Sequence, residues 1–173
     1  MKNNLTYIGL LFLWMLPVVA FGQNNEAKEL FKKGDVLYRN ADYKEAIELY
    51  NKVLELEPDH AQALLQRGFC KNLTGDFKGA IEDFTSVIRL NPDHMWAYLS
   101  RGSALNKTGD YAAAIKDFDK ALELDPKNQE AYNNRGFSKK LAGDKQGACE
   151  DWNTSRKLGN DEARIILKNN GCK

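Results

Sequence analysis

The chain has 173 residues, of which 43% are hydrophobic and 28% are charged, and its 25 basic and 24 acidic residues give a formal net charge of +1. This length suffices for one domain with a continuous core. A charge so close to zero lacks the clustered excess of Lys and Arg that holds a phosphate backbone, so we expect no nucleic-acid partner.

The N-terminal segment, from Met1 to Gly22, has the layout of a signal peptide. Lys2 stands next to the start, an uncharged apolar run follows, and small residues precede Gln23. We expect cleavage after Gly22, which would leave an exported protein without stable membrane insertion, located in the periplasm, at the cell surface or outside the cell. The alternative is an uncleaved anchor, which Pro17 and the shortness of the apolar run disfavour.

A 34-residue period organises the rest of the chain. Four glycines mark it, namely Gly34, Gly68, Gly102 and Gly136. Alanine, aromatic and proline columns keep the same interval: Ala46, Ala80, Ala114 and Ala148, then Tyr50, Phe84, Phe118 and Trp152, then Pro58, Pro92 and Pro126. This pattern resembles the tetratricopeptide repeat. The resemblance implies four units, at residues 27–60, 61–94, 95–128 and 129–162, after a short linker at residues 23–26.

Each unit is expected to form two helices. In unit three, apolar and small residues recur at helical spacing on both sides of a TGD break. One unit alone buries too little apolar surface, so the resemblance implies an all-α, right-handed superhelix (α-solenoid) of four helix-turn-helix units. A capping helix is expected at residues 163–173, and its predicted apolar side consists of Ala163, Ile165, Ile166 and Leu167.

Units two to four share a second pattern, in which an arginine precedes the glycine and an aspartate precedes the aromatic residue. Unit one has Lys33 and Leu49 at these positions. Because both residues are present or absent together, we predict ion pairs between the two helices of a unit: Arg67 with Asp83, Arg101 with Asp117, and Arg135 with Asp151. The alternative is a row of arginines that binds an anionic ligand, which the nearby carboxylates disfavour because they would neutralise the arginines.

The cysteines and histidines have separate interpretations. Cys149 and Cys172 are disulfide candidates in an exported protein, and the alternative is two small buried thiols. Cys70 is expected to be a free thiol in the core. His60 and His94 follow aspartates in turns, where we expect the aspartate to cap the next helix; four convergent ligands are missing, so we expect no metal site.

Catalytic and cofactor-binding motifs are missing from the sequence. It contains no glycine-rich phosphate-binding motif, no serine nucleophile elbow and no zinc-protease motif. We therefore expect no enzyme activity and no cofactor.

In the tetratricopeptide family the first helices of successive units line the concave side. Carried over by position, the resemblance implies a partner-binding groove formed by eight residues: Phe31, Tyr38, Leu65, Phe69, Trp96, Leu99, Asn106 and Phe137. An exposed apolar strip on a soluble protein usually marks a contact site. The alternative is that several of these residues pack between adjacent helices.

Chaperone-binding members of the family hold a partner's terminal carboxylate with Lys, Asn and Arg. That clamp is absent here, because the matching positions are Phe31, Asp35, Gln66, Trp96 and Ser100. The resemblance therefore implies a non-enzymatic scaffold whose groove receives another peptide or protein. The alternative is an envelope assembly component that binds cell-wall glycan or a second copy of itself.

Overall fold

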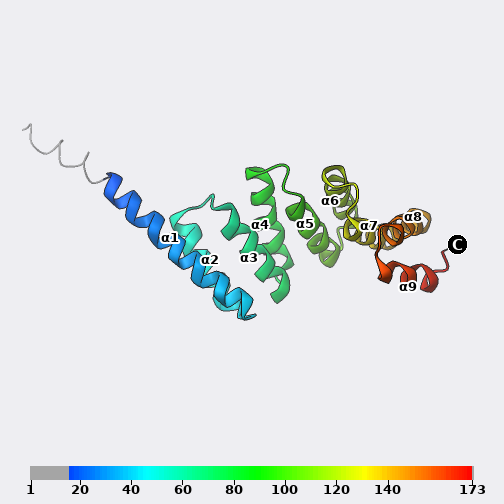
Figure 1. Cartoon of the computed structure of the whole chain (residues 1–173), viewed down its shortest axis with the longest axis horizontal. Coiled ribbons are helices and arrows are strands. Elements are labelled where there is room, and N and C mark those ends of the chain that lie inside the picture. Colours follow the sequence, from blue (N-terminus) through cyan, green and yellow to red (C-terminus); the bar gives the residue numbers. More distant parts are fainter. Residues whose placement is uncertain (1–15, 173) are drawn as a thin grey trace, which may run out of the picture.

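The computed structural model describes the chain over residues 16–172, and its side chains from residue 25 onward. Within this range the chain forms nine α-helices and no strand (Figure 1). Their bounds are α1 Leu16–Arg39, α2 Tyr43–Leu56, α3 Ala61–Thr74, α4 Phe77–Leu90, α5 Met95–Thr108, α6 Tyr111–Leu124, α7 Gln129–Leu141, α8 Lys145–Lys157 and α9 Asp161–Asn169.

The predictions of a signal peptide and of a linker concern residues 1–26, which are described only from residue 16 onward. Residues 1–15, which hold most of the predicted signal peptide, lie outside the described residues. Residues 23–26 were expected as a linker but are helical, because α1 runs through them. Between residues 16 and 172, no helix has the combination of length and apolar character that a membrane crossing requires.

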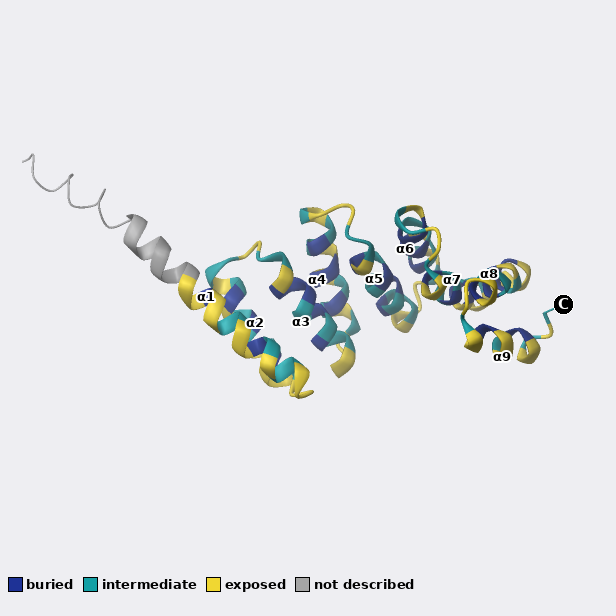
Figure 2. Cartoon of the chain, viewed as in Figure 1, coloured by how far each residue is buried: buried dark blue, intermediate teal, exposed yellow. Residues whose placement is uncertain are grey.

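The helices stack as consecutive pairs along one axis, which confirms the predicted all-α, right-handed solenoid. The pairs are α1 with α2, α3 with α4, α5 with α6 and α7 with α8, and each second helix also packs against the first helix of the next pair. The first helices of neighbouring pairs touch one another as well. They form the inner wall, and buried residues follow the seam between the pairs (Figure 2).

In units two to four, the turn between the two helices combines a left-handed glycine with a capping aspartate. A glycine with φ between 87° and 93° follows the first helix, at Gly75, Gly109 and Gly143. The next residue is an aspartate that caps the second helix, as Asp76 does by accepting a hydrogen bond from the Gly79 amide at 3.0 Å. In unit one Ala41 takes the left-handed position with φ 65°, and Asp42 makes no capping hydrogen bond.

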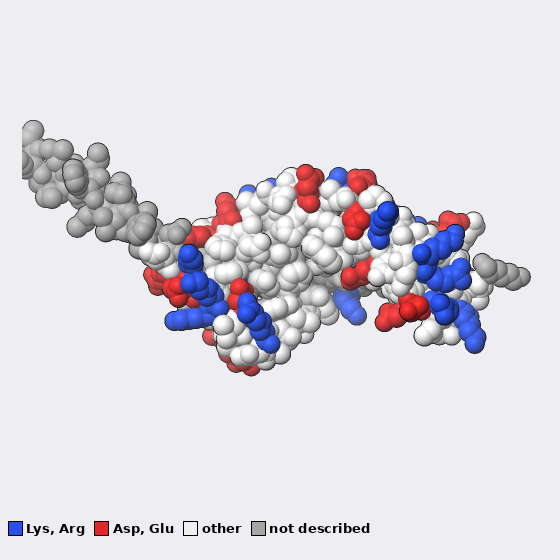
Figure 3. All heavy atoms as spheres, viewed as in Figure 1, with Lys and Arg blue, Asp and Glu red and all other residues white. Residues whose placement is uncertain are grey.

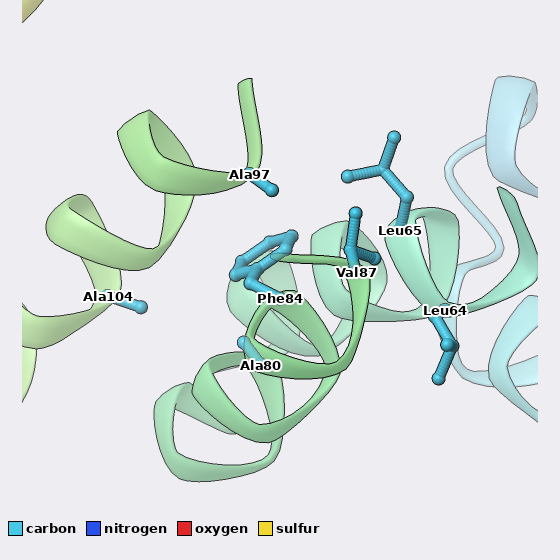
Figure 4. Close-up of a cluster of buried hydrophobic side chains, with 7 residues drawn as sticks. All are labelled: Leu64, Leu65, Ala80, Phe84, Val87, Ala97 and Ala104. Atoms are coloured by element: carbon cyan, nitrogen blue, oxygen red, sulfur yellow. The ribbon is translucent and has the colours of Figure 1, made fainter. Parts of the chain in front are cut away.

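The glycine column allows a helix to lie directly against an aromatic ring. A Cβ atom built on Gly102 would lie 2.9 Å from Cε1 of Phe118, and one on Gly68 would lie 2.7 Å from Cε1 of Phe84. Carbon atoms do not approach so closely, so any side chain there would displace the ring. Figure 4 shows Phe84 between its own helix and α5, in the cluster that also contains the α5 alanines.

The C-terminal helix α9 closes the array. Ala163 and Leu167, one turn apart, are buried, and Leu167 packs with Ala148 and Trp152 of α8. A disulfide joins Cys149 of α8 to Cys172, whose Cα atoms lie 5.5 Å apart. The prediction for Ile165 is wrong: it is 63% exposed, because the contact with α8 is set by the helix face that carries Ala163 and Leu167.

Replacing Gly102 with alanine tests the contact between glycine and ring. Alanine normally stabilises a helix interior over glycine by about 0.5–1 kcal/mol. Here we expect the opposite sign, a loss of about 1–3 kcal/mol in the free energy of unfolding, because the new methyl group overlaps the Phe118 ring. Urea unfolding of the two proteins measures the difference.

The double variant Gly102→Ala with Phe118→Leu is the control. Without the ring the methyl group meets no aromatic atom, so the two losses should be non-additive by more than about 0.5 kcal/mol. A Gly102→Ala protein as stable as its parent would contradict the close contact.

Candidate functional site

All eight predicted groove residues lie on first helices, but they differ in accessibility. Trp96 is 52% exposed and Phe137 is 36% exposed. Leu65 and Leu99 are buried, with 8% and 3% exposure, because each packs between its own unit and the next. The two leucines therefore offer little surface to a partner, and of the two only Leu99 lines a hollow of the inner wall.

Two adjoining hollows lie on the inner wall. The first, of about 340 Å³, is lined by Phe69, Asn72, Trp96, Leu99, Ser100, Ser103 and Glu130. The second, of about 300 Å³, is lined by Ser103, Asn106, Lys107, Asn134, Phe137 and Leu141. Because Ser103 lines both, the hollows meet and form one groove across α3, α5 and α7, which we call the Ser103 groove.

The Ser103 groove exists because unit three has a small residue where its neighbours have a phenylalanine. Ser103 lies one repeat period from both Phe69 and Phe137. Those two rings cover the buried aromatics Phe84 and Trp152 at centroid distances of 5.4 Å. Ser103 leaves the space open, and its hydroxyl is satisfied by donating to the carbonyl oxygen of Leu99 at 3.0 Å. The serine at this position is visible when the repeats are aligned, but only the structure shows the space that the missing ring leaves.

Unit one carries a different residue at the repeat position of Phe69, Ser103 and Phe137. Asp35 stands there and accepts a hydrogen bond from the Tyr50 hydroxyl at 2.8 Å. Burial, together with this hydrogen bond, raises the pKa of Tyr50. Phe31 stacks on His60 at 5.0 Å and Tyr38 lies 5.8 Å from Tyr43, so the predicted groove residues of unit one contact neighbouring rings and lie outside the lining of the Ser103 groove.

Side-chain amides give the groove its polar groups. Oδ1 of Asn106 accepts a hydrogen bond from the Ser138 hydroxyl at 2.9 Å, which leaves its NH₂ group available as a donor. Asn72 is its equivalent in unit two, but Ala104 replaces the serine. Oδ1 of Asn72 is consequently buried without a hydrogen-bond partner among the described residues. Aromatic walls with amide donors suit a peptide, which presents both apolar side chains and main-chain carbonyls.

The two histidines have a structural function. Nδ1 of His60 accepts a hydrogen bond from the Ala63 amide, and Nδ1 of His94 accepts one from the Ala97 amide, both at 3.1 Å. The expectation that the preceding aspartates cap these helices is wrong, because the histidines do so themselves. In the described part of the chain, no three His, Cys, Asp or Glu side chains gather closely enough to hold a metal ion.

The predicted ion pairs are confirmed, and each arginine also reaches the preceding unit. Nε and Nη2 of Arg101 donate to the two carboxylate oxygens of Asp117 at 2.8 Å, while Nη1 donates to Oγ1 of Thr85 at 3.0 Å. Hydrogen bonding to Asp117 raises the pKa of Arg101. In the neighbouring units, Nη1 of Arg67 donates to Oδ1 of Asn51 at 2.7 Å, and Nη1 of Arg135 donates to Oδ1 of Asp119 at 2.6 Å. The arginines thus join three helices each, which removes the basis for an anion-binding row.

Comparison with known families agrees with this architecture. Tetratricopeptide repeat models match residues 27–60, 62–94, 96–128 and 118–150. Together they cover more than half of the chain, which therefore belongs to the tetratricopeptide repeat family. The fourth match overlaps the third and is offset from the expected fourth unit.

Solved structures of similar proteins share the fold. MamA from Desulfovibrio magneticus RS-1, residues 41 to the end, is 26% identical with a TM-score of 0.75, over 79% of this chain and 78% of its own. The first tetratricopeptide domain of Spaghetti (RPAP3), bound to the HSP90 peptide SRMEEVD, is 28% identical with a TM-score of 0.66, over 69% of this chain and 94% of its own. A search of curated proteins found no match.

A double-mutant cycle tests the bridge between Arg101 and Asp117. Both side chains are largely buried, with 20% and 8% exposure. We expect Arg101→Gln and Asp117→Asn each to lower the free energy of unfolding by about 1.5–3 kcal/mol, because each leaves a charged partner without its hydrogen bonds. The double variant should lose less than the sum by more than about 0.5 kcal/mol. Additive losses in urea unfolding would contradict the bridge.

Proposed function

We propose that the protein is a non-enzymatic interaction scaffold that binds a peptide segment of another protein in the Ser103 groove. The observation that carries this proposal is the pair of hollows that meet at Ser103, between the rings of Phe69 and Phe137. Concave, largely apolar sites with a few polar groups are typical ligand sites. A peptide bound to the similar domain of Spaghetti (RPAP3) supports the choice of ligand class.

The shape and polarity of the groove define the peptide further. A bulky apolar side chain of the ligand fits over Ser103, with the exposed Trp96 ring beside it. The amides of Asn72 and Asn106 lie on the same wall and are placed to bond main-chain groups of the ligand. A peptide that depends on its terminal carboxylate is disfavoured, because the chain lacks the clamp residues of chaperone-binding relatives.

Filling the hollow tests this proposal. Ser103→Phe restores the phenylalanine of units two and four, so the helix should accept it while the space disappears. Random-peptide display on the parent protein should enrich peptides with a bulky apolar residue. Ser103→Phe should weaken the selected peptides at least about tenfold, equivalent to about 1.4 kcal/mol. Trp96→Ala should cost about 2 kcal/mol or more, as at aromatic hot spots.

The matched control is Ala112→Phe, which adds the same side chain at an exposed position of α6, outside the groove lining. It should bind the peptides as the parent does, and urea unfolding shows that all variants are folded. Equal binding by the parent and by Ser103→Phe would refute the groove assignment. So would a selection that enriches no peptide.

We propose in addition that the protein is exported and that the segment up to Gly22 is removed. Two observations support this: the signal-peptide layout of the N-terminal segment, and the disulfide between Cys149 and Cys172, which is typical of oxidising compartments. The third cysteine does not compete for either partner. Cys70 is buried and free, and burial raises the pKa of its thiol to about 11.

Protein isolated without reductant tests export and the disulfide together. We expect the intact mass of a chain that begins at Gln23. A thiol reagent should label no cysteine in the folded protein near neutral pH, because Cys70 is buried and protonated. After unfolding it should label one cysteine, and after reduction all three. Three labelled thiols without reductant would contradict the disulfide, and retention of the segment before Gln23 would contradict cleavage.

A further inference from the structure

The Ser103 groove runs along α5. Helix α5 contributes a lining residue from every turn, and these residues are Trp96, Leu99, Ser100, Ser103, Asn106 and Lys107. Residues three and four apart share one face of a helix, so the row follows the helix axis. Helices α3 and α7 lie on either side of α5 and supply the remaining lining. A peptide that fills both hollows therefore lies along α5.

The groove has one charged residue toward each end. Glu130 is the single charged residue that lines the first hollow, and Lys107 is the single one that lines the second. Both residues are exposed. Neither side chain forms an ion pair or a hydrogen bond with another described residue. Both are therefore available to a charged group of a ligand.

Charged side chains are unevenly distributed over the molecule. On the face that Figure 3 draws, a broad area over the middle units is uncharged, and the charged side chains gather toward the edges and the two ends. The lining of the Ser103 groove has the same mainly uncharged character. A ligand in the groove therefore meets Glu130 and Lys107 without competing charges from the rest of the lining.

The acidic end of the groove also has an open aromatic ring. Trp96 lines the same hollow as Glu130, and it is 52% exposed. The ring has no ring contact and no cation partner among the described residues. A Lys or Arg of a ligand can lie over the face of a tryptophan ring, where the ring attracts the cation, and pair with a carboxylate at the same time. This end is therefore suited to a basic side chain.

The positions along α5 set the spacing of the ligand. From Trp96 to Ser103 is seven positions, or about 10 Å at the rise of a helix, and from Ser103 to Lys107 is four positions, or about 6 Å. An extended peptide rises about 3.3 Å per residue. The two spans therefore correspond to about three and about two residues of an extended ligand.

We propose that the Ser103 groove selects an extended peptide with a defined order of charges. A Lys or Arg lies between Trp96 and Glu130, a bulky apolar residue three positions along fills the space over Ser103, and an Asp or Glu two positions further pairs with Lys107. This inference rests on the proposed peptide-binding function and specifies the class of peptide.

Both charges also suit the helices that carry them. Glu130 lies in the first turn of α7 and Lys107 in the last turn of α5, where each complements the helix dipole. A change in stability on replacing either residue is therefore no measure of the proposal. A change in which peptides are bound is one, because the helix dipole has no influence on the sequence of a ligand.

Display of a peptide library tests the order and the spacing. Every peptide carries one fixed tryptophan with random residues on both sides. On the parent protein, selection should enrich Lys or Arg three positions from the tryptophan, and Asp or Glu two positions from it on the other side. The enriched sequences also show the chain direction along α5.

Two charge reversals should each change the selected sequences at one place. Glu130→Lys should enrich Asp or Glu three positions from the tryptophan, and Lys107→Glu should enrich Lys or Arg two positions from it on the other side. Each reversal should weaken a labelled peptide from the parent selection at least about tenfold, because an attraction becomes a repulsion. Reversing the matching charge of that peptide should restore its binding.

Glu82→Lys and Lys78→Glu are the matched controls, because they make the same charge changes at exposed positions of α4, outside the groove lining. Both should select the same sequences as the parent, and urea unfolding shows that all variants are folded. If neither groove variant shifts the selection, or if the controls shift it equally, the inference is wrong. A parent that binds peptides without this charge pattern refutes the inference and leaves the peptide groove standing, whereas a parent that enriches no peptide refutes both.

Discussion

The contact between a glycine and an aromatic ring is the constraint on which the rest of this structure depends. Without a Cβ atom at Gly68 or Gly102, the first helix of a unit lies directly against the ring of the second helix. The ring is then completely buried, as Phe84 and Phe118 are. Its other side remains available to the next unit, whose alanines pack there. Repetition of this contact in every unit produces an extended array instead of a closed globule.

The arginine bridges pair charged groups inside the array. Each bridge joins an arginine to an aspartate in its own unit and to a polar residue of the preceding one. The half-buried arginines and their buried aspartates therefore neutralise each other. The inner wall is left with aromatic rings and side-chain amides, which suit a peptide better than a charged polymer.

Because the units repeat so regularly, a position at which one unit carries a different residue stands out. At one position of the inner wall the units carry Asp35, Phe69, Ser103 and Phe137. The aspartate accepts a hydrogen bond from Tyr50, the two phenylalanines cover buried rings, and the serine leaves a hollow. The hollow that we propose as the peptide site therefore lies where one unit differs from its neighbours. The common residues maintain the stack.

The period, the all-α fold and the arginine–aspartate pairs were predictable from the sequence, because spacing within a repeat determines which residues share a helix face. The cysteine pair was predictable as a candidate for a similar reason, since both cysteines lie where the last two helices meet. The tertiary structure alone decided the capping function of His60, the burial of Leu65, the exposure of Ile165 and the hollow over Ser103. These depend on how closely neighbouring helices approach and on the space left between them, and a one-dimensional pattern contains neither quantity.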